Sequence, residues 1–206
     1  MGLFRGSVTL TRYQVVGNLP SSLADFLDQR VRRFAFRSIE DGTEELAVGW
    51  VSVHDYLDTE FAYGGYHLDP YIVLGMRIDR RRLPAALVKK YHRLEIQKAL
   101  ASLPPGEKLG RSRREELKEK TRLDLLRRLP PATQAVDVCW DTNRRRLWLG
   151  SATGSVRELF EELFQRTFEL TLRPLIPWLL ARELVGPKGL EPLEAARPLA
   201  LYREEA

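Results

Sequence analysis

Residues Lys108–Ala132 read KLGRSRREELKEKTRLDLLRRLPPA, and this stretch decides the fold because it predicts a long helix with almost no apolar face. At 100° per residue, the basic side chains fall into two groups on different sides, namely Arg111, Lys118 and Arg122, and Arg113, Lys120 and Arg127. The leucines do not form one stripe and crowd toward the C-terminal end. A helix that is polar all round in its first half either projects into solvent or lies on something charged. From Ser112 to Arg128 such a helix is about 25 Å long, so we expect it to project.

Two ion pairs are expected to stabilise this predicted helix, and two prolines are expected to end it. Glu116 with Lys120, and Asp124 with Arg128, have the favourable i,i+4 order and each stabilise a helix by about 0.2–0.5 kcal/mol. The dipeptide Pro130-Pro131 is expected to end the helix sharply and to stiffen the turn that returns the chain to a sheet.

The remaining elements follow from hydrophobic periodicity. Strands are predicted where apolar, β-branched and aromatic residues alternate or cluster, over residues 7–17, 46–53, 71–79, 135–141 and 146–152. Helices are expected after Ser22, from Pro84 to Ala101 and after Ser155. Capping-box spacing marks three starts, at Ser22 with Asp25, Ser112 with Glu115 and Ser155 with Glu158. This order does not alternate regularly, so it favours an α+β fold with antiparallel sheet packed against helices.

Two helices of this set are amphipathic. In the helix after Ser155, apolar residues recur at helical spacing from Val156 to Phe168, which predicts a core helix. In the Pro84–Ala101 helix we expect Leu87, Tyr91 and Leu94 to share the packed side. We divide the chain into an N-terminal α+β part (1–80), a basic helical finger (81–132), a hairpin-helix part of the same core (133–185) and a loosely held tail (186–206).

Composition excludes several classes of protein. With 206 residues and 44% hydrophobic content, the chain can bury a core and is not expected to be disordered. Its one cysteine excludes an internal disulfide and any multi-cysteine metal site. No apolar run reaches the roughly 18 residues of a membrane span, and the N-terminus lacks a signal-peptide core, so we expect a cytoplasmic protein without membrane contact. No cofactor is expected.

Charge is segregated along the chain. Residues 80–128 hold sixteen Lys and Arg against six Asp and Glu, a local balance of +10 in a protein whose net charge is +5. Uncompensated positive charge costs self-repulsion unless a polyanion neutralises it. The segment therefore predicts nucleic-acid binding.

Two other functions fit parts of the sequence. The stretch HDYLDTE places His54, Asp55, Asp58 and Glu60 close together, and clustered carboxylates hold the metal ions of metal-dependent nucleases. The charged helix could also dock onto an acidic protein, which would make the chain a basic interaction module.

Several motifs in succession resemble the RdgC family, the recombination-associated proteins of bacteria. They are GWVSV from Gly49, RIDRRRLPAALVKK, REELKEKTRLDLLRRLP, and VCWD followed by a hairpin and the ELFEELF helix, and they span about residues 3–180. The resemblance implies a non-catalytic protein that binds DNA without sequence preference and restrains a RecA-type recombinase by occupying its DNA. It also implies a homodimer in the bacterial nucleoid. Duplex DNA is the expected partner, and single-stranded DNA is left open.

The resemblance implies that the charged helices form a projecting finger, as the corresponding helices do in the RdgC family. Its basic side chains become candidates for phosphate contacts, and they are Lys89, Lys90, Arg93, Arg111, Arg113, Arg114, Lys118, Lys120, Arg122, Arg127 and Arg128. The finger tip is expected just after the Leu-Pro, where the family has an aromatic residue and this chain has Pro131, Ala132 and Thr133. We therefore do not expect an aromatic wedge to distort DNA here. Longer members continue past this chain with a part that contributes to closing a dimeric ring, so the chain resembles a short form.

Overall fold

The computed structural model describes residues 8–20, 22–61, 66–104, 107–186 and 189–195. In these residues the elements follow the order β1 (Thr11–Val16), α1 (Leu23–Arg33), β2 (Leu46–Val51), β3 (His67–Leu68), β4 (Tyr71–Arg80), α2 (Ala85–Ala101), α3 (Arg111–Arg128), β5 (Ala132–Asp141), β6 (Arg146–Leu149), α4 (Gly154–Phe168), β7 (Thr171–Pro174), α5 (Pro177–Val185) and α6 (Leu190–Ala195). The predicted α+β class is confirmed. Of the predicted tail, α6 is described, whereas residues 187–188 and 196–206 lie outside the described residues.

The strands form one antiparallel sheet in the order β2-β4-β5-β6-β1-β7, with β3 paired to β4. The N-terminal strand β1 lies between β6 and β7, so the two ends of the described core meet in the same sheet. Strand β3 follows the stretch HDYLDTE in the sequence, and residues 62–65 between them lie outside the described residues.

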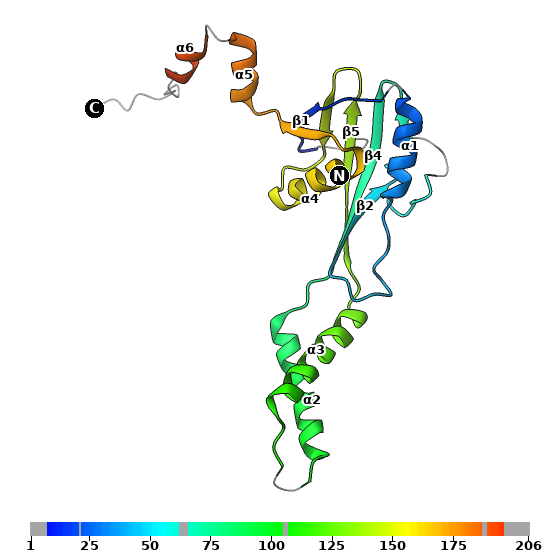
Figure 1. The fold of residues 1–206 in the computed structure, drawn as a ribbon, viewed down its shortest axis with the longest axis vertical. Helices are drawn as coiled ribbons and strands as arrows, with labels where there is room; N and C mark the ends of the chain where they lie inside the picture. The colour runs from blue at the N-terminus through cyan, green and yellow to red at the C-terminus, as the bar shows by residue number, and fades with distance from the viewer. Residues whose placement is uncertain (1–7, 21, 62–65, 105–106, 187–188, 196–206) are drawn as a thin grey trace, which may run out of the picture.

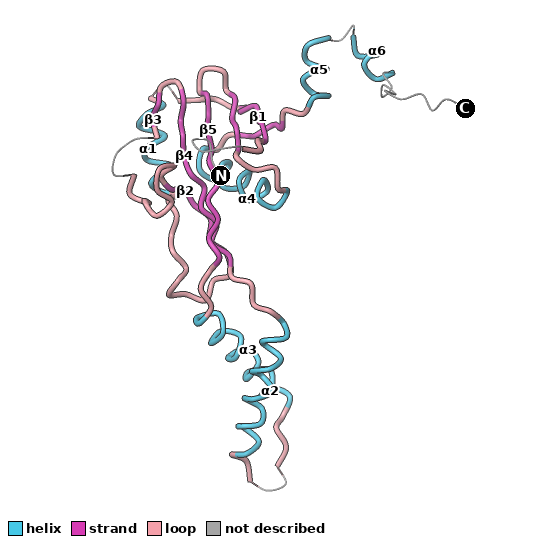
Figure 2. Tube along the Cα trace, turned by 180° about the vertical axis from the view of Figure 1, so that it is seen from behind, coloured by secondary structure: helices cyan, strands magenta, loops and turns pink. Residues whose placement is uncertain are grey.

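The finger is connected to the sheet through its two longest strands, β4 and β5. All ten residues of β4 pair with all ten of β5, from Tyr71 opposite Asp141 to Arg80 opposite Ala132. The helices α2 and α3 are inserted between these strands, so the finger extends the β4–β5 hairpin away from the body of the sheet (Figures 1 and 2).

The hydrophobic core lies on one face of the sheet, under α1 and α4. In β4 the alternate residues Ile72, Leu74, Met76 and Ile78 all belong to it, because residues two apart in a strand lie on the same face. The predicted amphipathic helix is confirmed as α4, whose Val156, Phe160, Leu163, Phe164 and Phe168 are buried. Burial of such side chains contributes about 1.5–3 kcal/mol each to folding.

Trp50 links β2 to α4 through a buried hydrogen bond. The Trp50 side chain is fully buried, and its indole N–H donates a hydrogen bond of 2.8 Å to the hydroxyl oxygen of Thr167. The Thr167 hydroxyl in turn donates to the Leu163 carbonyl oxygen at 2.7 Å. Each buried polar group of this contact therefore has a partner, which fixes the rotation of α4 on the sheet.

The neighbouring residue Gly49 permits a close crossing of two backbone segments. A Cβ atom at this position would lie 2.4 Å from the Cα atom of Phe36. We predict that Gly49→Ala lowers the free energy of unfolding by about 1–3 kcal/mol, because the crossing segments must separate. Urea unfolding followed by tryptophan fluorescence measures the change. Gly154→Ala is the control, since a Cβ there meets nothing within 4 Å, and equal losses for the two variants would contradict the steric account.

The predicted capping boxes do not form. Ser22 is the N-cap residue of α1, but its side chain makes no capping hydrogen bond. Helices α3 and α4 begin at Arg111 and Gly154, so Ser112 and Ser155 lie inside the first turn. A serine within the helix no longer occupies the N-cap position from which its hydroxyl would accept a hydrogen bond from a free backbone N–H.

Candidate nucleic-acid interface

The finger is a pair of helices with a narrow packed interior of its own. In α3 the buried residues Leu117, Thr121 and Leu125 are spaced i, i+4, i+8 and form one stripe. The Thr121 hydroxyl donates to the Leu117 carbonyl oxygen at 2.6 Å, so this polar group is satisfied within the helix. The prediction of a helix without a packed side was wrong, because the leucines alone do not reveal a stripe that a threonine completes.

The packed side of α2 also differs from the prediction. Val88, His92 and Ile96 are half-buried at i, i+4, i+8, and the His92 Nε2 atom lies 3.1 Å from the Arg114 carbonyl oxygen of α3. Tyr91 and Leu94, which were expected to pack, are 37% and 41% exposed. The stripe is rotated because a histidine, which the apolar pattern does not count, takes an inward position.

Arg81 anchors the base of the finger. Its guanidinium is buried and donates hydrogen bonds to four carbonyl oxygens, those of Leu129 at 2.8 Å, Gly42 at 3.0 Å, Glu44 at 3.2 Å and Glu40 at 2.7 Å. Leu129 follows α3, whereas the other three acceptors belong to the segment before β2. One side chain therefore joins the end of the finger to the body of the protein.

This geometry corrects the expected finger tip. Ala132 begins β5 and pairs with Arg80, the last residue of β4. Pro131, Ala132 and Thr133 therefore lie at the base of the finger, and the opposite end, between α2 and α3, is its tip (Figure 2). The placement at the tip was wrong because the chain re-enters the sheet directly after Leu129.

We predict that Arg81→Lys lowers the free energy of unfolding by about 1–3 kcal/mol. A lysine keeps the charge but lacks the planar fork of donors that reaches several carbonyl oxygens at once, so buried acceptors lose their partners. Thermal and urea unfolding measure the loss. Arg82→Lys serves as the control because Arg82 is exposed; an Arg81→Lys protein as stable as this control would contradict the anchoring role.

The eleven predicted basic residues all lie on α2 and α3, and we call them the basic finger surface. Ten of them are exposed and Arg122 is half-buried. Arg113 pairs with Glu116 at 2.8 Å, and Arg122 pairs with Glu45 and, at 3.6 Å, with Glu119. The other nine form no ion pair with any described residue. Most of the positive charge is therefore available to an external anion.

The stabilising pairs within α3 were predicted wrongly. Glu116 pairs with Arg113 and not with Lys120, and no ion pair joins Asp124 to Arg128. The observed partners are three residues apart, a spacing that also brings helix side chains together.

The basic finger surface has two unlike sides, which flank the stripe that packs α2 against α3. On one side a cleft of about 620 Å³ is lined by Lys89, His92, Lys118 and Arg122, together with Arg82 at the base, and Glu45 is its one carboxylate. We call it the basic cleft. Lys118 and Arg122 line it together, as predicted, whereas Arg111, the third member of that predicted group, is not among its lining residues.

The opposite side has mixed charge. Lys120 and Arg128 lie there beside Glu95 and Asp124, around a small cavity of about 70 Å³. A hydrogen bond from Lys98 lowers the pKa of the Glu95 carboxyl, so this group remains ionised at neutral pH. Negative charge on this side offsets part of the attraction that its cations exert on a polyanion.

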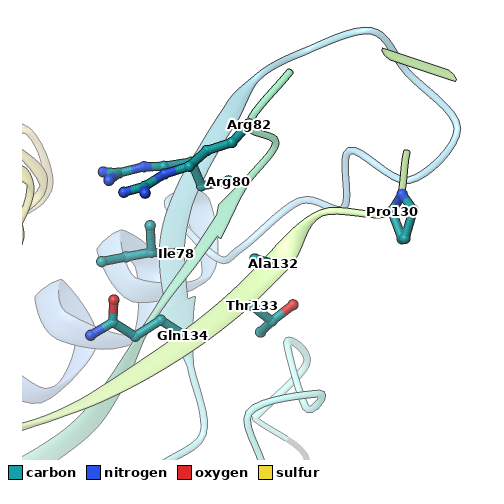
Figure 3. A pocket seen from close by; sticks show the side chains of 7 residues that line it. All are labelled: Ile78, Arg80, Arg82, Pro130, Ala132, Thr133 and Gln134. Atoms are coloured by element: carbon teal, nitrogen blue, oxygen red, sulfur yellow. The ribbon is translucent and has the colours of Figure 1, made fainter. Parts of the chain in front are cut away.

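The sequence-based site omitted three polar residues at the finger base. Arg80, Arg82 and Gln134 line a further cavity of about 400 Å³ where the β4–β5 hairpin meets the finger (Figure 3). Arg80 and Arg82 belong to the RIDRRR cluster and contribute to the positive charge of residues 80–128. Alternation along β4 would have placed Arg80 on the same face as Ile78, because residues two apart in a strand point the same way.

The alternative metal site is not assembled in the described part of the chain. Asp55 Oδ1 accepts a hydrogen bond from the Leu57 N–H at 2.9 Å, and Asp58 Oδ1 accepts from the N–H groups of Glu60 at 3.0 Å and Phe61 at 2.9 Å. These carboxylates therefore shape their own loop. No three His, Cys, Asp or Glu side chains gather as metal ligands among the residues with described positions.

Fold and surface together define an α+β protein with a projecting, basic two-helix arm. The family model described as "Putative exonuclease, RdgC" matches residues 9–179. The chain belongs to the RdgC family, which associates it with recombination, and the resemblance found in the sequence is confirmed. No curated protein sequence matches the chain.

The described helices contain no membrane-spanning segment. None of them combines the length and the apolar character that crossing a bilayer requires.

Proposed function

We propose that the protein binds DNA through the basic finger surface, without sequence preference and without catalysis. The observation that carries this proposal is the set of nine exposed Lys and Arg side chains on α2 and α3 that form no ion pair with a described residue. Lysine and arginine on the projecting helical arm are suited to contact phosphate oxygens, and such contacts position DNA but carry no base information.

The biological role in the proposal rests on family membership. By occupying DNA the protein restrains a RecA-type recombinase, and it acts as a homodimer in the bacterial nucleoid. Duplex DNA is its main partner. A polyanion as partner agrees with the segregated charge, because residues 80–128 carry a balance of +10 within a chain of net charge +5.

Binding without sequence preference has a direct test. Two duplexes of equal length and unrelated sequence are titrated in the same buffer, and the expected dissociation constants agree, since phosphate contacts are common to both. A clear preference for one duplex, lost when a single basic residue is replaced, would indicate base readout and contradict the proposal.

The description of the family as an exonuclease makes nuclease activity the second candidate. End-labelled duplex and single-stranded DNA are incubated with the protein and Mg²⁺ or Mn²⁺. We expect intact DNA at protein concentrations that saturate binding. Progressive shortening of the labelled strands, abolished in an Asp55→Asn and Asp58→Asn double variant, would instead support the nuclease.

A further inference from the structure

The core face of β4 changes character where the helices stop covering it. Alternate residues along this face read Ile72, Leu74, Met76 and Ile78, and then Arg80. The pattern continues beyond the strand to Arg82, and Gln134 lies opposite Ile78 on β5. The sheet face thus passes from apolar to basic without a change of strand, at the point where the finger begins.

Arg80 and Arg82 extend to the same side of the hairpin as Ile78 and Gln134, and all four residues line one cavity (Figure 3). Nearby arginines are already satisfied: Arg77 is bound to Asp79, and Arg81 is bound to four carbonyl oxygens. By contrast, neither Arg80 nor Arg82 forms an ion pair or a side-chain hydrogen bond with a described residue.

Two neighbouring guanidinium groups repel each other unless an anion lies between them. Phosphate suits such a site, because its oxygens accept several charge-assisted hydrogen bonds and guanidinium donors match their spacing. The amide of Gln134 adds a neutral donor on the same side.

We infer that Arg80, Arg82 and Gln134 form a phosphate-binding site at the base of the finger, which takes a phosphodiester group of a DNA strand. Arg82 also lines the basic cleft with Lys89, Lys118 and Arg122, so the two cavities adjoin. A strand bound there continues from the sheet onto the cleft side of the finger. This inference rests on the proposed DNA binding and adds which side of the finger the strand follows.

The test compares two variants that each remove two positive charges. Arg80→Ala with Arg82→Ala empties the inferred site, whereas Arg144→Ala with Arg146→Ala removes the same charge from exposed positions at the β5–β6 turn, the end of β5 away from the finger. The full-length proteins are titrated with duplex DNA at several salt concentrations. Urea unfolding of both variants establishes that each is folded under the conditions of the titration.

For the Arg80 and Arg82 variant we expect the slope of log K against log salt concentration to fall by about 0.9, since the site neutralises one phosphate and each phosphate contributes about 0.9. The slope of the Arg144 and Arg146 variant is expected to stay at the wild-type value, because these residues lie outside the proposed DNA-binding surface. Equal changes in both variants, or none in the first, overturn the inferred site while leaving the proposed function standing. Wild-type protein that does not bind DNA at all refutes the proposed function itself.

A second experiment distinguishes a site for the phosphate groups of DNA from a site for free inorganic phosphate. Inorganic phosphate is titrated into the wild-type protein at constant ionic strength and followed by calorimetry. Absence of stoichiometric binding, combined with the lost slope, supports a site for the DNA strand. Stoichiometric phosphate binding that disappears in the Arg80 and Arg82 variant, with an unchanged DNA slope, identifies a site for small phosphate ligands and overturns the inference.

Discussion

Asp79→Ala is expected to lower the free energy of unfolding by about 3–5 kcal/mol, because it leaves a buried arginine without its partner. Asp79 is fully buried and accepts hydrogen bonds from the Nε and Nη2 atoms of Arg77 at 2.9 and 2.7 Å. The Arg77 guanidinium also lies 4.2 Å from the centre of the Phe36 ring. Hydrogen bonding to Asp79 raises the pKa of Arg77. The guanidinium also stays charged in the variant, because arginine does not lose its proton in proteins.

Urea unfolding followed by the fluorescence of buried Trp50 and Trp140 measures this loss. The matched control is Glu116→Ala, which breaks the exposed pair with Arg113 and should cost under about 1 kcal/mol. If Asp79→Ala proved no more costly than this control, the buried Arg77 guanidinium would not depend on Asp79 as its partner. Replacing both partners by apolar residues should restore much of the stability, because no unpaired charge then remains.

Charge reversal in the basic cleft is expected to have the largest effect on DNA binding. Lys118→Glu with Arg122→Glu should weaken binding on the order of 10- to 100-fold near 100 mM salt, since two phosphate contacts are lost. The loss should be similar for every sequence, because these contacts read no bases. The measurement is a duplex titration by fluorescence anisotropy.

The control for this pair is Lys120→Glu with Arg128→Glu, which changes the net charge equally on the side that already carries Glu95 and Asp124. We expect a much smaller loss there. If both double variants weakened binding equally, the finger would act through its overall potential and not through a defined face. A loss confined to some sequences would point to base contacts.

Much of the fold could be predicted from local patterns. The apolar spacing from Val156 to Phe168 predicted α4, because burial of one helix face imposes that period. The β-branched and aromatic content of residues 71–79 predicted β4. The irregular order of helices and strands was enough for the α+β class. The long charged helix and its prolines also indicated where the finger leaves the core.

The faces of the finger helices could not be predicted in the same way. Thr121 and His92 complete the two packed stripes, and each uses a hydrogen bond to a backbone carbonyl oxygen that no hydrophobic pattern records. The tip was misplaced for a related reason. Both Leu83-Pro84 and Leu129-Pro130 lie at the base, where the chain leaves and re-enters the sheet. A proline marks that a helix begins or ends, but not at which end of a hairpin it does so.

The sequence predicted which basic residues belong to the candidate site, but not how they are arranged in space. The eleven basic residues are on the finger as expected, but their division into a basic cleft and a side of mixed charge depends on how α2 rotates against α3. Arg80 and Arg82 were missed because their role depends on where α4 stops covering the sheet, and this is set by packing between segments distant in sequence.

The salt dependence of duplex binding by the wild-type protein tests the central claim most directly. If the basic finger surface neutralises about six or more phosphates, the affinity should fall by roughly a thousandfold or more between 50 and 200 mM salt, because bound counterions are released on association. Affinity that does not change with salt, or no binding at 50 mM, would contradict the claim that this surface binds the DNA backbone.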